Sequence, residues 1–352
     1  MESPSRITLT LWAKRNRERE EEFHPLCHHL LDVAQVTSLI WSERVSGSVR
    51  SRFAEELGLR EPEAGTWIAY WSGLHDLGKA SPAFQGKVAR GRAQAESVGL
   101  EFPHPAGSAP HGTLTARELP PLLSQSDGCP APLPSDLAQR LATAVGGHHG
   151  VFPRAEELLF ADPRSAGGHR WSEVRREIVH LLAGALGLRN LTAPSGNPGN
   201  AFLFFLAGLT SVADWIGSNE AFFPFAADHE WNAYLALSRE RARTALERLG
   251  WSGWTPAPES RTFLEVFPAC APARPLQAEA AAAAETLRPP ALVLIEAPMG
   301  EGKTEAALFI ADRLAQARGL AGFYLALPTQ ATSNQMFGRI VSYLGGGTPA
   351  SG

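Results

Sequence analysis

A chain of 352 residues, 44% of them hydrophobic, can bury the cores of two domains, or of one domain and part of another. No stretch reaches the roughly 18 apolar residues that a membrane span needs, and the N-terminus has no apolar signal core, so we expect a cytoplasmic protein with no membrane association. The formal net charge of −4 gives no overall positive field, so binding of a polyanion must come from local basic patches or from a partner. The cysteines, Cys27, Cys129 and Cys270, are far apart, so neither a disulfide framework nor a thiolate zinc site is indicated.

Helical periodicity dominates the first 250 residues. The mixed-sign charges of residues 15–22 could form a local basic patch, but such a run is more typical of a solvated face. Further along, apolar residues recur at helical spacing, and we expect helices over about 25–40, 67–74, 136–145 and 201–216. The last of these is apolar almost all round, which marks a buried central helix. Segments rich in Pro, Gly and Ser predict loops over 101–135 and 192–200. Residues 1–254 are therefore predicted to form a mainly α-helical domain.

A different pattern begins after Trp254. Several prolines indicate a linker over 255–275, and an alanine-rich helix is expected over 278–285. Continuous apolar runs at 291–295 and 323–327 are typical of strands buried on both faces, and a helix is expected between them from about Lys303 to Ala317. Strand, helix and strand make one parallel unit, so residues 276–352 predict an incomplete α/β segment.

Histidine and aspartate residues stand at the ends of two predicted helices and inside a third. His75 and Asp76 end one apolar helix, and His148 and His149 follow another. Adjacent side chains on a helix point about 100° apart, so one such pair can serve two neighbouring metal ions. Asp214 lies inside the most apolar helix, where a carboxylate is unfavourable unless it is paired with a cation. We therefore expect a positive group beside Asp214.

Other histidines leave the interpretation open. His29 is expected on the polar side of the first helix, and His111 in the loop 101–135. Several more are expected to be ordinary core or capping residues: His24, His104, His169, His180 and His229. Spacing alone is compatible with a metal site and with scattered structural residues.

The ordered set of histidines and aspartates resembles the nuclease domain of the CRISPR-associated HD helicase-nuclease, the effector of type I CRISPR systems. The resemblance covers roughly 250 residues and rests on three segments: His-Asp-Leu-Gly-Lys-Ala-Ser-Pro-Ala-Phe-Gln at 75–85, Gly-Gly-His-His-Gly at 146–150 and Ala-Asp-Trp-Ile-Gly-Ser-Asn at 213–219. It implies an HD-superfamily helical fold with two divalent metal ions. One ion would be held by His29, His75 and Asp214, the other by His111, His148 and His149, with Asp76 bridging the two.

Two details of this site follow from the resemblance. His28 adjoins His29 and could be the ligand instead, although the Leu-Leu-Asp-Val-Ala that follows His29 matches the family's pattern. Asp76 and Lys79 are the expected catalytic residues. Lys79 comes just past the helix end, where it is placed to contact the scissile phosphate or is an ordinary surface lysine. Two cations can stabilise the attacking and leaving oxygens of a phosphodiester displacement. An imidazole-rich shell suits iron, manganese, cobalt or nickel better than magnesium.

A phosphate-binding loop follows the first predicted strand. Residues 297–304 read Ala-Pro-Met-Gly-Glu-Gly-Lys-Thr, a P-loop with alanine in place of the first glycine. Its backbone N–H groups, together with Gly300 and Gly302, are expected to cradle the phosphates of ATP. Lys303 would reach the β and γ oxygens, and Thr304 would hold Mg²⁺.

The flanks of this loop resemble superfamily 2 helicases. Gln277 looks like the glutamine that reads adenine, and residues 327–332 look like a DNA-contacting segment. The same CRISPR family carries such a motor after its nuclease. The sequence holds no Asp-Glu box, second RecA-like lobe or arginine finger, so we expect a truncated motor that binds ATP without hydrolysing it.

The resemblance implies a monomeric nuclease that cleaves single-stranded DNA after recruitment by a crRNA-guided surveillance complex (Cascade). No element resembles a major-groove reader, so little sequence preference is expected. Two alternatives stay open: an HD phosphohydrolase acting on nucleotides, and a non-catalytic remnant that only binds DNA or the surveillance complex.

Overall fold

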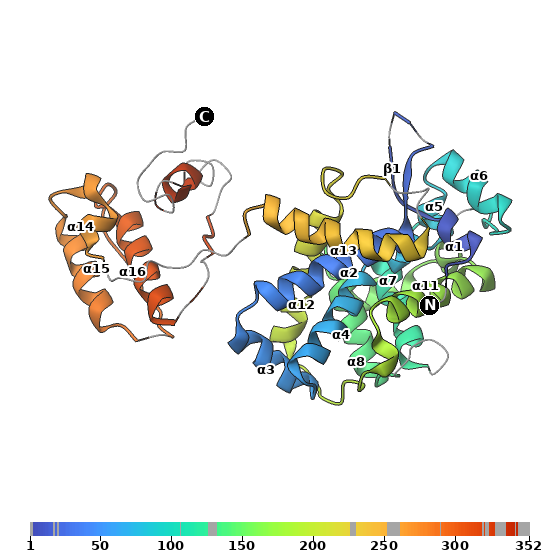
Figure 1. The fold of residues 1–352 in the computed structure, drawn as a ribbon, viewed down its shortest axis with the longest axis horizontal. Helices are drawn as coiled ribbons and strands as arrows, with labels where there is room; N and C mark the ends of the chain where they lie inside the picture. Colours follow the sequence, from blue (N-terminus) through green and yellow to red (C-terminus); the bar gives the residue numbers. More distant parts are fainter. Residues whose placement is uncertain are drawn as a thin grey trace. The chain divides into compact units, whose positions relative to one another are not determined.

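The computed structural model divides the chain into two compact units, residues 1–250 and 251–352 (Figure 1). It describes all residues except 1–2, 17, 20, 106, 126–131, 226–229, 252–260, 289, 319, 321–323, 328–335, 342 and 344–352. Cys129, His229 and most of the expected DNA-contacting segment 327–332 lie outside the described residues.

The first unit is built from helices around one hydrophobic core. Its longer elements are α2 (Leu26–Glu43), α3 (Gly47–Leu57), α4 (Glu61–Gly73), α6 (Ala89–Ser97), α7 (His111–Ser124), α8 (Ser135–Gly146), α11 (His169–Ala185), α12 (Asn200–Gly217) and α13 (Trp231–Arg248). Its short elements are α1 (Arg6–Thr10), β1 (Trp12–Arg15), β2 (Phe23–Pro25), η1 (Leu77–Lys79), α5 (Pro82–Gln85), α9 (Ala155–Phe160), α10 (Pro163–Ala166) and η2 (Leu188–Asn190). The predicted helical fold class is confirmed, and α2, α4, α8 and α12 are the helices expected from periodicity.

Helix α2 lies at the centre of this unit, packed against α4, α11, α12 and α13 (Figure 1). Because neighbours cover it on several sides, His29 is fully buried, and the expectation that it lies on the polar side of the helix is wrong. Helix α12 alone among the described residues has the length and hydropathy of a membrane span. Half of it is buried within this unit, against α2, α4 and α8, so it is a core helix here.

The predicted loop over 101–135 is wrong in its middle, which forms α7. Two prolines, Pro120 and Pro121, lie inside this helix. The sequence does not predict a helix here because proline interrupts helical hydrogen bonding. Packing compensates: α7 lies along α8 and buries Leu114, Leu119 and Leu122 in the interior. The helix also fixes His111 at its first position.

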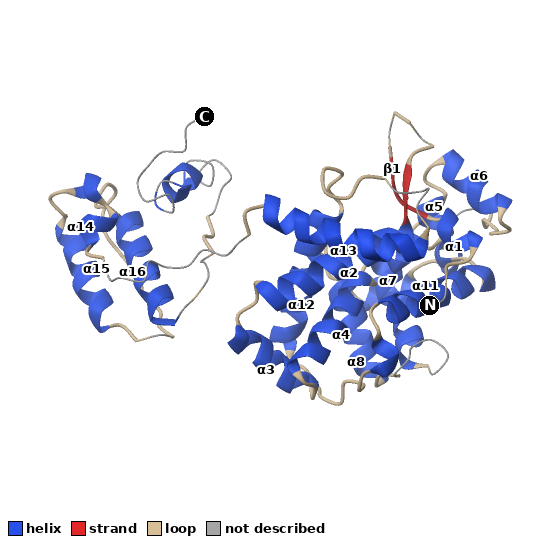
Figure 2. Cartoon of the chain, viewed as in Figure 1, coloured by secondary structure: helices blue, strands red, loops and turns tan. Residues whose placement is uncertain are grey.

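The charged segment near the N-terminus forms part of a β-hairpin. Strands β1 and β2 pair antiparallel, Lys14 opposite His24, and are the only strands in the described part of the chain (Figure 2). Lys14 turns inward and donates a hydrogen bond from Nζ to the carbonyl of Gly217 at 2.9 Å. Lys14 immediately precedes the charged segment 15–22 and is half-buried.

The second unit has a small core of its own between α15 (Pro275–Thr286) and α16 (Lys303–Arg318). Part of the expected linker also belongs to it, as α14 (Phe263–Val266) and η3 (Pro268–Cys270), and Phe263 packs its ring 5.4 Å from that of Phe309. The linker prediction is wrong for these residues because aromatic side chains there complete the core.

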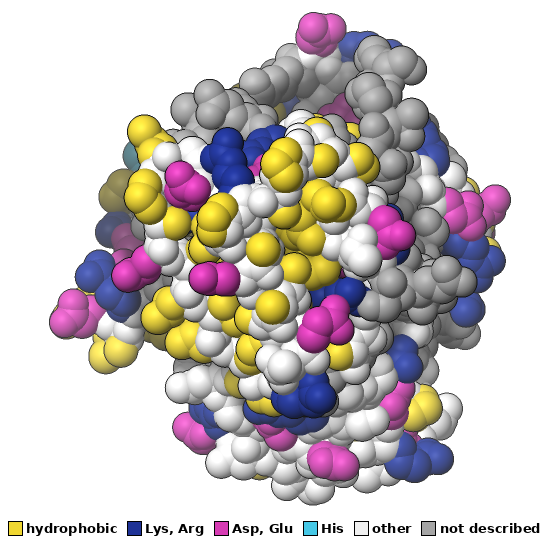
Figure 3. Space-filling model, turned by 90° about the vertical axis from the view of Figure 1, so that its left-hand side faces the viewer, with side chains coloured by type: hydrophobic (Ala, Val, Ile, Leu, Met, Phe, Trp, Pro, Cys, Tyr) yellow, Lys and Arg dark blue, Asp and Glu magenta, His cyan; other side chains and the backbone are white. Residues whose placement is uncertain are grey.

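Neither predicted strand of this unit is formed by its described residues. Residues 291–295 and 324–327 run as irregular chain. Leu292 and Leu294 are 87% and 82% exposed and Tyr324 is 92% exposed. Figure 3 shows hydrophobic side chains gathered on one face of the molecule. A strand is stable only when neighbours satisfy its backbone groups, and the described residues of this unit offer none.

Candidate functional site

Three helices of the first unit bring four of the predicted metal ligands together. Helix α2 supplies His29, the turn after α4 supplies His75 and Asp76, and α12 supplies Asp214. His29 Nε2 lies 3.3 Å from an oxygen of Asp214, and His75 Nε2 lies 3.5 Å from the same oxygen. All four residues are buried, and their ligand atoms lie within 4.8 Å of one another. Two imidazoles thus lie beside Asp214, where a positive group is expected.

A second cluster holds the other three predicted ligands. His111 begins α7, and His148 and His149 follow the end of α8. Their ligand atoms also lie within 4.8 Å of one another, with His111 Nε2 3.1 Å from His149 Nε2. His148 is buried, His111 is partly exposed and His149 is exposed, so this cluster faces solvent and the first does not.

Asp76 joins the two clusters. Its Oδ2 lies 3.3 Å from His29 Nε2 and 3.4 Å from His75 Nε2. Its Oδ1 lies 3.2 Å from His111 Nε2 and 3.6 Å from His148 Nε2. One oxygen therefore faces each cluster, which is the arrangement of a bridging carboxylate.

Backbone hydrogen bonds aim the buried imidazoles inward. The Nδ1 atoms of His75 and His148 lie 2.9 Å and 2.8 Å from the carbonyls of Ser72 and Val145. A carbonyl only accepts, so each Nδ1 donates, and in the neutral imidazole each Nε2 is then free to bind a metal ion. Ser218 similarly donates to Asp214 Oδ1 at 2.8 Å.

The atoms left facing the centre are suited to a metal ion. Nε2 of His29, His75 and His148 and Oδ1 of Asp76 are buried without a hydrogen-bond partner among the described residues. Buried polar atoms rarely stay unpaired, since each costs about 1–3 kcal/mol in lost solvation. Imidazole nitrogens and carboxylate oxygens are ligands for divalent transition metals, so the donor set fits the expected pair of ions.

The electrostatics of the centre follow from close packing of opposite charges. Burial alone lowers the pKa of His75, but Asp76 and Asp214 raise it to about 9. Burial alone raises the pKa of Asp76, but Lys79, with Nζ 2.5 Å from Oδ2, and His75 hold it well below its usual value. Burial and the charge on His75 lower the pKa of His148 to about 3, so this imidazole is neutral.

The structure places His29, and not His28, in the cluster. The ring of His28 stacks on Tyr234 of α13, with centroids 4.0 Å apart and planes inclined by 15°. His28 therefore joins α2 to α13, while the side chain of His29 points to Asp76 and Asp214.

Sequence reasoning missed a buried network beside this centre. Asp32 accepts hydrogen bonds from Tyr234 at 2.9 Å and from Ser238 at 2.6 Å, and lies 2.7 Å from His24 Nε2. His24 is therefore part of a network and not an isolated core histidine. The argument used for Asp214 could have found Asp32, another carboxylate inside an apolar helix. Lys14 lies in the field of this group as well: burial lowers its pKa to about 8, against the opposing pull of Asp32 and Asp214.

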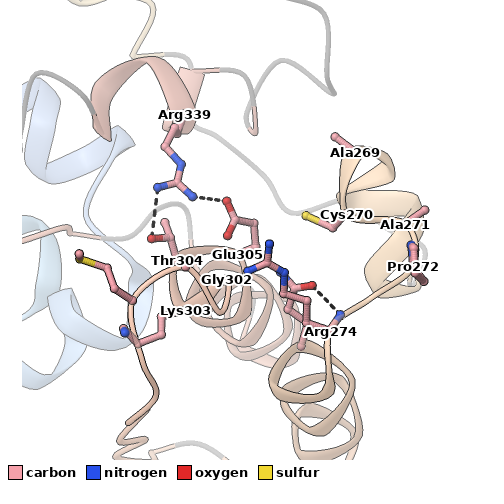
Figure 4. Close-up of a pocket in the computed structure, with 13 residues that line it drawn as sticks. Ala269, Cys270, Ala271, Pro272, Arg274, Gly302, Lys303, Thr304, Glu305 and Arg339 are labelled. Carbon is pink, nitrogen blue, oxygen red and sulfur yellow. Dashed lines mark hydrogen bonds and ion pairs between the residues drawn. The ribbon is translucent and has the colours of Figure 1, made fainter.

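The predicted nucleotide-binding residues of the second unit line one pocket of about 810 Å³ (Figure 4). Gly300 and Gly302 have φ angles of 90° and 80°, which only glycine adopts without strain. Lys303 Nζ donates to the carbonyls of Ala297 and, at 2.9 Å, Pro298, while Thr304 accepts from Arg339 at 3.4 Å. Gln277 is buried beside Gly302, its Oε1 accepting from the backbone of Arg274 at 3.0 Å.

Known proteins share both parts of the chain. The sequence model of one family, described as "Cas3, HD domain", matches residues 12–223. A "CRISPR-associated endonuclease/helicase Cas3" of Thermus thermophilus is 37% identical over 97% of this chain, which spans 36% of that relative's length. The crystal structure of the Thermus thermophilus cas3 HD domain in the presence of Ni²⁺ superposes with a TM-score of 0.50 and 33% identity, over 70% of this chain and 92% of that one. A chain of a "CRISPR RNA-guided surveillance complex, pre-nicking" superposes with a TM-score of 0.61 and 30% identity, over 97% of this chain and 38% of that one.

Proposed function

Because this chain belongs to the Cas3 HD-domain family, we propose that its first unit is a metal-dependent nuclease that cleaves single-stranded DNA in type I CRISPR interference. The observation that carries the proposal is Asp76, a buried carboxylate whose two oxygens each face a separate cluster of ligand atoms. Two divalent ions held at this centre would supply the charge that stabilises the attacking and leaving oxygens of an in-line phosphodiester displacement.

The residues have distinct roles in this proposal. His29, His75 and Asp214 would hold one ion, His111, His148 and His149 the other, and Asp76 both. Iron, manganese, cobalt or nickel suits this imidazole-rich set better than magnesium, and the related domain crystallised with Ni²⁺ supports that choice. Lys79, 13% exposed beside Asp76, is positioned to contact the negatively charged scissile phosphate.

The substrate and partner are inferred from the relatives and from the charge of the chain. A net charge of −4 gives no general attraction for DNA, so the strand must be delivered, and the similarity to a chain of a crRNA-guided surveillance complex supports delivery by such a complex. The second unit is proposed to bind ATP and Mg²⁺ through Gln277, Gly300, Gly302, Lys303 and Thr304.

Incubation of metal-free protein with Mn²⁺ or Ni²⁺ and circular single-stranded DNA tests the nuclease proposal. We expect cleavage of the circle, much slower cutting of intact duplex, and no release of products from a panel of nucleotides. Hydrolysis of nucleotides but not of DNA would favour a phosphohydrolase, and no turnover of any substrate would favour a binding role alone.

The role of Lys79 can be tested against a matched control, Lys87, because both lysines lie near the ring of Phe84. The Nζ atoms of Lys79 and Lys87 lie 5.2 Å and 4.8 Å from its centroid, but only Lys79 also contacts Asp76. Lys79→Ala should lower kcat by about 10²-fold, the typical contribution of one transition-state donor. Lys87→Ala should leave kcat unchanged, and equal losses in both variants would remove Lys79 from the mechanism.

A further inference from the structure

A pocket of about 470 Å³ lies beside the second histidine cluster. His111 and His149 line it, so the same two side chains belong to the pocket and to the candidate metal centre. Val151, Pro153 and Phe160 contribute an apolar wall. This volume falls within the roughly 300–1,000 Å³ of pockets that hold small organic groups.

The apolar wall is exposed to solvent. The side chain of Phe160 is 83% exposed and that of Val151 is 74% exposed. Large hydrophobic side chains that are exposed in a pocket can bury their apolar surface only when a ligand binds there. The pocket is thus prepared for a partly apolar ligand.

The segment that carries this wall is anchored on both sides. Phe152 packs edge-on against Phe204 of α12, with ring centroids 5.4 Å apart. At the other end, Arg117 Nη1 of α7 donates to the carbonyl of Ala161 at 2.7 Å. Phe160 is therefore held next to the histidine cluster by contacts on either side of it, which lowers the entropy lost when a ligand binds.

We propose that this pocket binds a nucleobase of the single-stranded DNA substrate, with Phe160 as its stacking surface. The inference rests on the proposed nuclease function. A phosphodiester held at the two clusters has a nucleoside on either side, and the pocket adjoins the cluster that faces solvent. The base must be unpaired to enter, because a base in a duplex has first to leave its stack.

This pocket explains how the nuclease would prefer single-stranded to duplex DNA without preferring a particular base sequence. Every base has a π-face, so one phenylalanine accepts all four. Besides the apolar wall, the lining offers two imidazoles, the hydroxyl groups of Ser108 and Thr113, and one carboxylate, Glu157. That carboxylate is already bonded to Arg154 at 3.0 Å, and hydroxyl groups donate and accept, so they suit every base. The pocket therefore distinguishes single strand from duplex and distinguishes the bases weakly.

The test compares Phe160→Ala with Leu159→Ala in the full chain. Leu159 is its neighbour on α9 and is 79% exposed, but it does not line the pocket. Each variant is loaded with Mn²⁺, its metal content is measured, and cleavage is followed on a single-stranded oligonucleotide and on a stable abasic analogue of the same length. A second measurement follows the fluorescence of 2-aminopurine in a single strand bound to the metal-free proteins, because stacking on an aromatic ring quenches it.

Phe160→Ala should lower kcat/KM on the oligonucleotide by about tenfold and leave the abasic substrate and the metal content unchanged. Quenching should be lost in this variant, while Leu159→Ala matches the wild type throughout. Equal rates for Phe160→Ala and wild type on the oligonucleotide, or equal losses on both substrates, would overturn the proposal. The proposal would also be overturned if Phe160→Ala lowered cleavage only in the presence of the surveillance complex. That result would make the pocket a protein-docking site. If the wild type cuts no DNA at all, the nuclease proposal fails, and the quenching experiment still decides the pocket.

Discussion

At the scale of single residues, the candidate centre depends most on Asp76. Its carboxylate is 1% exposed and would be strongly destabilised alone, yet three imidazoles and the Lys79 ammonium lie within 3.4 Å of its oxygens. This surplus of positive or metal-ligating groups around one buried carboxylate explains its lowered pKa. It also makes Asp76 the group that both proposed ions share.

Asp76→Ala should therefore remove both metal ions, whereas His111→Ala should empty mainly the site that faces solvent. The reason is that each oxygen of Asp76 serves a different cluster, while His111 belongs to one. Elemental analysis after equilibrium dialysis against Mn²⁺ measures the stoichiometry. Two ions are expected for the wild type, none for Asp76→Ala and about one for His111→Ala. A single ion in fully loaded wild-type protein would contradict the dinuclear centre.

Metal affinity should rise with pH. His75 keeps its proton up to about pH 9 in the metal-free protein, although an unperturbed histidine loses it near 6.5. Its charge therefore stabilises the metal-free fold fully below about pH 6.5, and this contribution is lost as the pH rises through about 9. A metal ion requires the neutral imidazole and must displace that proton.

The apparent affinity should accordingly increase about tenfold per pH unit from about pH 7 to 9 and then level off. Titration against a competing chelator measures this slope, and calorimetry in buffers of different ionisation enthalpy counts the protons released. His75→Gln, which carries no titrating group, is the control and should show a shallower slope. A wild-type affinity that does not vary with pH would show that His75 is neutral before the metal binds.

At the scale of elements, periodicity predicts four of the longer helices of the first unit and gives no prediction for α3, α11 and α13. Helices α2, α4, α8 and α12 follow from their sequences, but α7 does not, because Pro120 and Pro121 disfavour a helix that is stabilised by its packing against α8 and η1. Six of the seven proposed ligands could be placed on or next to predicted helices. The exception is His111, whose position depends on α7.

The structure also shows contacts that no sequence pattern reports. Thr115 of α7 donates to the carbonyl of His75 at 2.8 Å and accepts from the backbone N–H of Gly78 at 2.9 Å. These bonds fix the turn that carries His75 and Asp76 against the helix that carries His111. The two clusters are therefore aligned by one threonine and one glycine, far apart in the chain.

Gly78→Ala should disturb this alignment. A Cβ at residue 78 would lie 2.0 Å from the carbonyl oxygen of His111 and 2.7 Å from the amide nitrogen of Thr115, so backbone must move. We expect a loss of about 1–3 kcal/mol in the free energy of unfolding, typical of overpacking, and weaker binding of the ion at the second cluster. Thermal denaturation and metal stoichiometry measure the two effects.

Gly184→Ala is the matched control, because a Cβ at that position in α11 meets nothing within 4 Å. It should leave stability within about 0.5 kcal/mol of the wild type and metal binding unchanged. Similar behaviour of the two variants would show that the contact between η1 and α7 does not position His111.

At the scale of the whole molecule, the chain has two separate hydrophobic cores of different size. The first unit buries dozens of hydrophobic residues around α2, while the second has a much smaller core between α15 and α16. The proposed metal ions and the proposed nucleotide are each bound by residues of one unit alone. The proposed metal-binding residues lie before residue 215, and the proposed nucleotide-binding residues lie after residue 276. Binding of either ligand should therefore stabilise only the unit that holds it.

Thermal unfolding should show two transitions that respond to different ligands. A ligand present at 100 times its Kd stabilises the unit that binds it by about 2.7 kcal/mol, and a unit without the site gains nothing. Saturating Mn²⁺ should therefore raise the melting temperature of the more stable transition, assigned to residues 1–250 by their larger core. ATP with Mg²⁺ should raise the other. Asp76→Ala should abolish the first shift and keep the second, and Lys303→Ala should do the reverse. A single transition that both ligands raise would show that the two units unfold as one, and a nucleotide shift that survives Lys303→Ala would place ATP outside the P-loop.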